Sequence, residues 1–162
     1  MHIETYQADR GALLPLFTLA DDSAARIAGY IALGEVLVAR DGDAIVGHAL
    51  IISADDAGVF ELKSMAVDAA RQGEGIGRAL VEAAVAFCRE RHGRRLVVST
   101  AAAGTGTLRF YQRQGFRMER IVRDAFGPAT GYAEGLLVDG IPLRDQVFLD
   151  RDLPPGEEHS KR

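Results

Sequence analysis

Residues 71–80 read RQGEGIGRAL, a stretch in which glycine stands at positions 73, 75 and 77 immediately before a helix-forming segment. The amide groups that open a helix have no partners within it, so they point outward as donors at the positive end of the helix dipole. Glycines at this point leave room for a bulky phosphate and allow the positive φ angles that aim several amides at it. The stretch therefore predicts a binding site for an anion, and pyrophosphate suits it best.

The spacing of the glycines excludes two common nucleotide-binding loops. A Walker loop needs lysine and then serine or threonine after its last glycine, whereas Gly77 is followed by arginine and alanine. A dinucleotide fingerprint that begins at either earlier glycine lacks its third glycine or small residue. What remains is the pattern Gln-x-x-Gly-x-Gly, which is made by Gln72, Gly75 and Gly77.

Around this loop, hydrophobic periodicity predicts a mixed α/β (α+β) domain. Upstream, β-rich runs separated by short turns, including one at 54–58, predict an antiparallel meander; downstream, a strand, a helix and a strand predict a crossover unit. The helix after the glycines carries one apolar stripe and is expected to end at Gly93. The predicted strands cover 2–6, 35–40, 44–53, 59–67, 94–101, 117–124 and 146–152, and the predicted helices cover 10–20, 22–33, 76–93 and 104–114.

Composition indicates one globular domain. The chain has 162 residues, of which 48% are apolar, and a formal charge of -4. We expect a single domain over 1–152 and a disordered tail over 153–162. The acidic balance argues against nucleic acid as a partner. The one cysteine, Cys88, cannot form an internal disulfide, and we find neither a signal peptide nor a membrane-crossing run, so a cytoplasmic protein without membrane contact is expected.

The glycine loop and its flanking segments resemble the acyl-CoA-binding signature of the GNAT superfamily of N-acyltransferases. The resemblance extends from about 35 to 122 and includes the strand that ends in MAV at 65–67 and the segment FYQRQGF at 110–116. It implies a mixed, mostly antiparallel central sheet that is splayed between two parallel strands and flanked by about four helices. It also implies transfer of an acetyl group from acetyl-CoA, as co-substrate, to an amine, and it implies no metal.

By this resemblance, two parts of the chain bind the cofactor. Met65 and Val67, with Ala66 between them, would offer backbone groups to the pantetheine arm and the acyl carbonyl. The amides of 72–78 would hold the pyrophosphate, and the side chain of Arg78 could add a charge nearby. Those seven residues are Gln72, Gly73, Glu74, Gly75, Ile76, Gly77 and Arg78.

The sequence departs from the family pattern seven residues before the tyrosine of FYQRQGF. Many family members have an asparagine there that contacts the pantetheine, and this chain has Gly104. Thr105 or Thr107 could supply a hydroxyl donor instead, or the loop backbone could bind the arm.

The resemblance also assigns two catalytic roles. Tyr111 occupies the place of the tyrosine that hydrogen-bonds the CoA sulfur and acts as general acid; the alternative is a core tyrosine whose hydroxyl binds a carbonyl. Glu61 resembles the general base of some members and is four residues before Met65, which would place both on one face of a regular strand. The alternative for Glu61 is an outward-facing strand glutamate or a salt bridge at a sheet edge.

The acceptor is the least determined part of the reaction. We expect a primary amine of a small molecule, and the alternatives are a macromolecular amine (a protein N-terminus, a lysine or an aminoacyl-tRNA) or a CoA-binding sensor without catalysis. Ser99 stands where the related ribosomal-protein acetyltransferases have a base glutamate, which weakens a protein N-terminus as the substrate. A homodimer is possible, with residues 146–152 as the added strand.

Other residues are weaker candidates for the acceptor site. His48 could line it, although a histidine in a strand is more often structural. Asp21 and Asp22 could bind a cationic acceptor, although a helix N-cap already explains them. Phe126 and Tyr132, in the long loop at 126–143, could form a lid or acceptor wall; the alternative is a mobile loop without catalytic importance.

Overall fold

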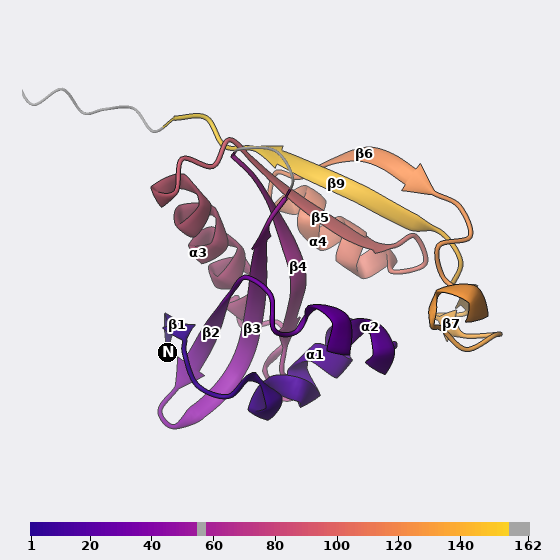
Figure 1. The fold of residues 1–162 in the computed structure, drawn as a ribbon, viewed down its shortest axis with the longest axis horizontal. Coiled ribbons are helices and arrows are strands. Elements are labelled where there is room, and N and C mark those ends of the chain that lie inside the picture. The colour runs from indigo at the N-terminus through magenta and orange to yellow at the C-terminus, as the bar shows by residue number, and fades with distance from the viewer. Residues whose placement is uncertain (55–57, 156–162) are drawn as a thin grey trace, which may run out of the picture.

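The computed structural model describes residues 1–54 and 58–155, and it contains a mixed sheet of seven strands (Figure 1). The order across the sheet is β1-β2-β3-β4-β5-β9-β6. The strands are β1 (His2–Tyr6), β2 (Glu35–Asp41), β3 (Ala44–Ser53), β4 (Val59–Val67), β5 (Arg95–Ala101), β6 (Arg117–Val122) and β9 (Gln146–Asp152). A separate small hairpin is formed by β7 (Leu137–Val138) and β8 (Ile141–Pro142).

The sheet is splayed at its centre, as the resemblance implies. In the part of the chain that the structure describes, β4 and β5 are its one parallel pair, and they pair only over Val59–Leu62 and Arg95–Val98. Beyond that point the two strands part, while β5 stays paired with β9 on its other side through Ala101. The fold class is confirmed, and the parting leaves a wedge between the last residues of β4 and β5.

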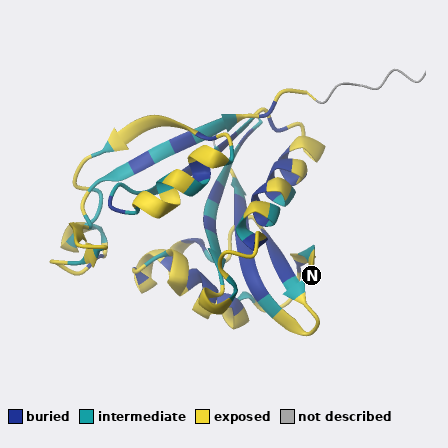
Figure 2. Cartoon of the chain, turned by 180° about the vertical axis from the view of Figure 1, so that it is seen from behind, coloured by how far each residue is buried: buried dark blue, intermediate teal, exposed yellow. Residues whose placement is uncertain are grey.

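Two groups of helices cover the two faces of the sheet. On one face lie the 3-10 turn η1 (Arg10–Leu13) and the helices α1 (Leu14–Ala20) and α2 (Ala24–Tyr30). On the other face lie α3 (Ile76–Glu90) and α4 (Thr105–Arg113), which β5 separates in the chain order. Figure 2 shows that the buried residues follow the strands and the sheet-facing sides of the helices. Short 3-10 turns, η2 (Ala69–Arg71) and η3 (Pro128–Thr130), precede α3 and the small hairpin.

The C-terminal end of α3 differs by one residue from the predicted cap. His92, not Gly93, has the positive φ, at 60°. Gly93 follows it, and its amide donates to the carbonyl of Cys88 at 2.7 Å, as in a Schellman motif. A Cβ on Gly93 would lie 2.7 Å from that carbonyl oxygen, so close approach rather than backbone conformation requires glycine there.

A β-bulge in β4 changes which residues share a face. The pairing with β3 shifts between Leu62 and Ser64, which leaves Lys63 as an extra residue. Leu62 packs in the cluster that includes α3, and so does Met65, although the two are three residues apart. Glu61 and Met65 therefore lie on opposite faces. The expectation that they share a face is wrong, because the bulge reverses the alternation between them.

His48, from β3, is buried on the α1 face. It is fully shielded from solvent, and its ring contacts that of Phe17 with a centroid distance of 4.3 Å. Its Nε2 lies 2.8 Å from Oγ of Ser64. Burial lowers the pKa of His48 to about 3, so the imidazole is neutral at pH 7. His48 does not line the acceptor site.

We expect His48 to make the fold sensitive to acid. The unfolded chain binds a proton on this residue below a pKa of about 6.5 and the folded chain does not, so stability falls as the pH drops below 6.5. At pH 5.5 the loss from this group is about 1.4 kcal/mol. Urea unfolding of the wild type and of His48→Gln at pH 7.5 and 5.5 measures it. The variant should lose less stability on acidification; an equal loss in both proteins would contradict the assignment.

The C-terminal strand is internal, which corrects its expected role in a dimer. Residues 146–152 form β9, which pairs with β5 on one side and β6 on the other, so no free edge remains on it for strand addition. Leu153, placed at the start of the tail by the sequence, is buried and its amide donates to the carbonyl of Arg94 at 2.8 Å. The rest of the expected tail, from 156, and most of the turn at 54–58 lie outside the described residues. No helix in the described ranges is long and apolar enough to cross a membrane.

Candidate active site

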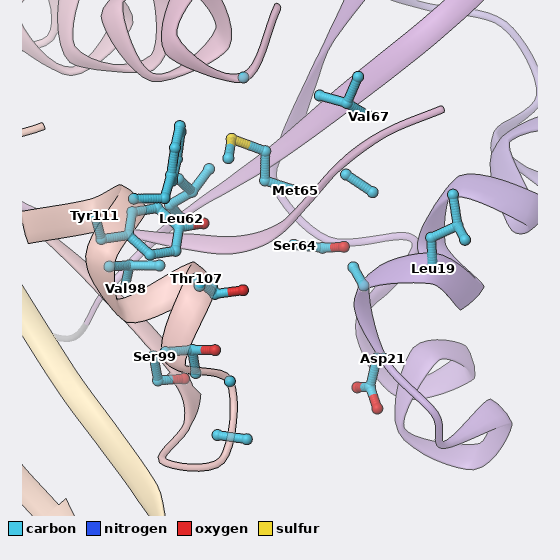
Figure 3. A pocket seen from close by; sticks show the side chains of 18 of the residues that line it. Leu19, Asp21, Leu62, Ser64, Met65, Val67, Val98, Ser99, Thr107 and Tyr111 are labelled. Carbon is cyan, nitrogen blue, oxygen red and sulfur yellow. The ribbon is translucent and has the colours of Figure 1, made fainter. Parts of the chain in front are cut away.

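The wedge between β4 and β5 opens into a cleft of about 1320 Å³. It runs from the glycine loop at the start of α3, past α4, to the junction of α1 and α2 (Figure 3). The residues expected to bind the cofactor or catalyse line this cleft, except Glu61, Glu74 and Thr105, the alternative to Thr107. The ones that line it are Met65, Ala66, Val67, Gln72, Gly73, Gly75, Ile76, Gly77, Arg78, Gly104, Thr107 and Tyr111.

The glycine loop has the backbone conformation that an anion cradle needs. Gly73 and Gly75 have φ angles of 83° and 84°, and a Cβ on either would meet no atom within 4 Å. The space beside them is therefore open, and the conformation is one that side chains oppose. Gly75 is the N-cap of α3 and has no capping side chain, so amides of the first turn remain available to a ligand.

Ion pairs of Arg71, which itself lines the cleft, hold this loop in place. Arg71 donates to Glu74 Oε2 from Nε at 2.9 Å and to Asp41 Oδ2 from Nη1 at 2.9 Å, which ties the loop to the turn between β2 and β3. This use of the Glu74 carboxylate explains why that residue does not line the cleft. The side-chain amide of Gln72 donates from Nε2 to the carbonyl of Val67 at 3.3 Å, which links the loop to the end of β4.

The third glycine serves packing between helices. A Cβ on Gly77 would lie 3.3 Å from Cζ of Phe110, so α3 and α4 approach closely there. Gly104 is the N-cap of α4, and a Cβ there would lie 3.2 Å from the carbonyl oxygen of Ala101. A larger residue at 104 would require this loop to move. Many family members have asparagine at this position, and Thr107, one helical turn later, carries the cleft-lining hydroxyl that is nearest to it in sequence.

Tyr111 lies in the wall of the cleft, with 5% of its surface exposed. Its ring packs edge-on between those of Phe110 and Phe116, at centroid distances of 5.1 and 5.4 Å. Burial raises the pKa of the hydroxyl, which stays protonated at neutral pH. Within residues 1–54 and 58–155 the Tyr111 hydroxyl makes no hydrogen bond, so it is available to donate to a ligand rather than bound to a carbonyl.

Glu61 lies on the α1–α2 face of β4, outside the lining of the cleft. Its side chain is 22% exposed, and Oε1 is 3.7 Å from Nζ of Lys63. Lys63 does line the cleft, and its Nζ lies 5.3 Å from the centroid of the Tyr30 ring. The structure thus shows an ion pair at Glu61, although β4 is a central strand and not the sheet edge at which the alternative placed it.

Asp21 organises the other end of the cleft. Its carboxylate accepts hydrogen bonds from the hydroxyls of Tyr132 (2.8 Å, to Oδ1) and Tyr30 (2.9 Å, to Oδ2) and from the amide of Ser23 (2.9 Å, to Oδ1). Burial, and then the neighbouring carboxylate, raise the pKa values of both tyrosines. A helix N-cap is expected from Asp21, Asp22 and Ser23 between them, and Ser23 supplies it, with its hydroxyl accepting from the amide of Arg26.

Several residues that line this end of the cleft were not predicted as site residues. Tyr30 and Ser64 line the cleft, but the sequence placed the first within a helix stripe and the second within a strand. Tyr132 was predicted as a wall residue and does line the cleft, against the ring of Phe126 at a centroid distance of 4.9 Å. The hydrogen bond between Asp21 and Tyr132 joins residues that are 111 positions apart, and no local sequence pattern predicts such a contact.

Comparison with known proteins establishes the family. The sequence model of the Acetyltransferase (GNAT) family matches residues 6–116, which include the cleft-lining end of β4, the glycine loop and Tyr111. The chain belongs to the GNAT acetyltransferase family. It is therefore an acetyl-CoA-dependent acyltransferase, with acetyl-CoA as its co-substrate.

Similar proteins extend over nearly the whole chain. The uncharacterized N-acetyltransferase YvbK of Bacillus subtilis is 29% identical over 153 residues, which cover 94% of this chain and 97% of that protein. A GNAT family acetyltransferase from Elizabethkingia anophelis, solved with acetyl-CoA bound, has a TM-score of 0.86 at 29% identity over 94% of this chain and 97% of its own. The IAA acetyltransferase from Bacillus cereus has a TM-score of 0.84 at 29% identity over 94% and 100%.

Proposed function

We propose that this acetyltransferase transfers the acetyl group of acetyl-CoA to a primary amine of a small molecule by direct attack. The observation that carries the proposal is the cleft itself, which is continuous from the glycine loop to the Asp21 end and has Tyr111 in its wall. One end suits an anionic cofactor and the other presents a carboxylate and aromatic rings. Both substrates can be present together, which direct attack requires.

The residues present fit acetyl-CoA. The open, positive-φ positions at Gly73 and Gly75 would admit the pyrophosphate to the amides that open α3. The unpaired edge of β4 after Leu62 would offer backbone groups of Met65 and Val67 to the pantetheine arm. Tyr111, Gly104 and Thr107 would complete the site near the thioester.

In the reaction, the amine nitrogen attacks the thioester carbon, the carbon–sulfur bond breaks, and the amide forms. The leaving thiolate takes a proton from the Tyr111 hydroxyl, which burial keeps protonated. The attacking nitrogen loses a proton, and Glu61 is our candidate to receive it through water. Direct contact between Glu61 and the amine is not part of the proposal, because Glu61 does not line the cleft.

A role for Glu61 predicts a change in the pH profile. Glu61→Gln should lower kcat/KM by roughly a hundredfold, the lower end of what a general base contributes, and should remove the acidic limb of the profile. The measurement is kcat/KM from pH 5 to 9 for the wild type, Glu61→Gln and Lys63→Met, the last of which breaks the same ion pair. If both variants keep the pH profile of the wild type, the Glu61 carboxylate takes no part in proton transfer and serves only the salt bridge with Lys63.

The preference for a small acceptor rests on the Asp21 end of the cleft. The hydrogen bond from Tyr132 to Asp21 connects the loop at 126–143 to the junction of α1 and α2, and both residues line the cleft. An extended peptide or a tRNA end would have to separate them, whereas a compact amine would not. An acceptor screen that follows release of the CoA thiol tests this: small primary amines should support turnover, and peptides with free N-termini should not. Turnover with peptides alone would overturn the preference.

Location and assembly remain predictions from the sequence. We propose a cytoplasmic enzyme, and if it forms a homodimer by strand addition, the outer strands β1 and β6 are the ones with free edges.

A further inference from the structure

His48 is a buried titratable residue that neither the core nor the proposed chemistry explains. It is fully shielded from solvent, its ring contacts that of Phe17, and it pairs with Val38 across β2 and β3. Among the described residues, its Nδ1 has no hydrogen-bond partner. A buried polar atom without a partner costs stability, and an apolar side chain of similar volume would avoid that cost. A role for this imidazole must therefore involve its other nitrogen, Nε2.

That other nitrogen meets a residue of the cleft. His48 Nε2 lies 2.8 Å from Oγ of Ser64, and Ser64 lines the cleft while only 5% of its surface is exposed. The bulge at Lys63 turns Ser64 toward the α1 face, and the next residue, Met65, packs on the opposite face. In Figure 3 the Ser64 hydroxyl points away from Tyr111, toward the side where Leu19 and Asp21 lie. Ser64 thus stands between the cofactor end and the acceptor end.

The hydrogen-bonding capacity of the pair leaves Ser64 able to accept from a ligand. Burial lowers the pKa of His48 to about 3, so the ring is neutral, with one donor nitrogen and one acceptor nitrogen. If Nε2 accepts from Ser64, both lone pairs of Oγ are free; if Nε2 donates, one lone pair remains. An amine that attacks a thioester directs its own lone pair at carbon, and its N–H groups then need acceptors.

We propose that Ser64 is a binding residue for the acceptor, whose Oγ accepts a hydrogen bond from the attacking amine, and that His48 is the positioning residue that fixes the Ser64 hydroxyl. This inference rests on the proposed function and names the site that receives the amine. The same neutral imidazole makes Ser64 a poor nucleophile, because burial disfavours the imidazolium that would form if His48 took its proton. Acetyl transfer therefore does not pass through an acetyl-Ser64.

The test compares Ser64→Ala, Ser64→Thr and His48→Leu with the wild type, using a small amine that the wild-type enzyme acetylates. Ser64→Ala should raise the KM for the amine about tenfold, the value of one hydrogen bond, with the Kd for acetyl-CoA within about twofold of the wild type. Ser64→Thr keeps the hydroxyl and should restore most of the affinity. His48→Leu should shift KM in the same direction, and the double variant with Ser64→Ala should be no worse than Ser64→Ala alone.

An unchanged amine KM in Ser64→Ala would overturn the inference, as would acetylated Ser64 in the intact mass of protein incubated with acetyl-CoA. If His48→Leu does not fold, the two Ser64 variants still decide. Failure of the proposed function looks different, since the wild type would then bind acetyl-CoA and acetylate no small amine.

Discussion

Tyr111→Phe is expected to lower kcat by about a hundredfold or more, the usual contribution of a positioned general acid, with little change in the Kd for acetyl-CoA. The substitution removes one oxygen and keeps the ring, so the packing against Phe110 and Phe116 survives. What is lost is a proton donor for the thiolate, and burial makes Tyr111 a well-protonated one. The measurement is the steady-state rate of thiol release at saturating substrates.

Tyr6→Phe is a matched control for this loss. Tyr6 is also buried, but its hydroxyl donates to the carbonyl of Asp9 at 2.7 Å and it lies outside the cleft. It should keep the wild-type kcat. A Tyr111→Phe variant whose kcat stays within twofold of the wild type would remove Tyr111 from the chemistry and leave it a core residue.

Gly75→Val is expected to weaken acetyl-CoA binding by at least about a hundredfold, the value of two hydrogen bonds to a charged group. Valine would strain a backbone with φ at 84° and would occupy the open space in front of the first turn of α3. The measurement is the rise in melting temperature on adding acetyl-CoA, which follows ligand affinity. Gly75→Val should show no rise in melting temperature at acetyl-CoA concentrations that stabilise the wild type.

Gly140→Val separates strain from lost binding. Gly140 also has a positive φ, of 80°, and open space around it, but it lies in the β7–β8 turn outside the cleft. Both variants should melt a few degrees below the wild type, and only Gly75→Val should lose the response to acetyl-CoA. Equal responses in both variants would mean that the glycine loop does not bind the cofactor.

The glycine loop was predictable because its requirements are local. Positive φ at Gly73 and Gly75 and free amides at a helix start depend on residues next to one another in the sequence. The wedge between β4 and β5 came from the family resemblance rather than from periodicity. The role of Tyr111 was predicted from the same resemblance, because the helix that carries this residue follows the glycine loop at the spacing typical of the family.

The acceptor end could not be predicted in the same way. The bulge at Lys63 reverses the faces of β4, and no residue type in FELKSM marks where an extra residue will sit. That reversal separates Glu61 from Met65 and turns Ser64 toward His48. The contact between Asp21 and Tyr132 likewise depends on how the 126–143 loop returns to the sheet, which is a property of the whole chain.

The most direct test of the central claim, that the splayed strands and the glycine loop form an acetyl-CoA site, is calorimetric titration of the purified protein with acetyl-CoA. One molecule should bind per chain, with an affinity that falls sharply in Gly75→Val and is kept in Tyr111→Phe. No binding heat with a correctly folded wild-type protein, or equal affinity in the wild type and Gly75→Val, would contradict it.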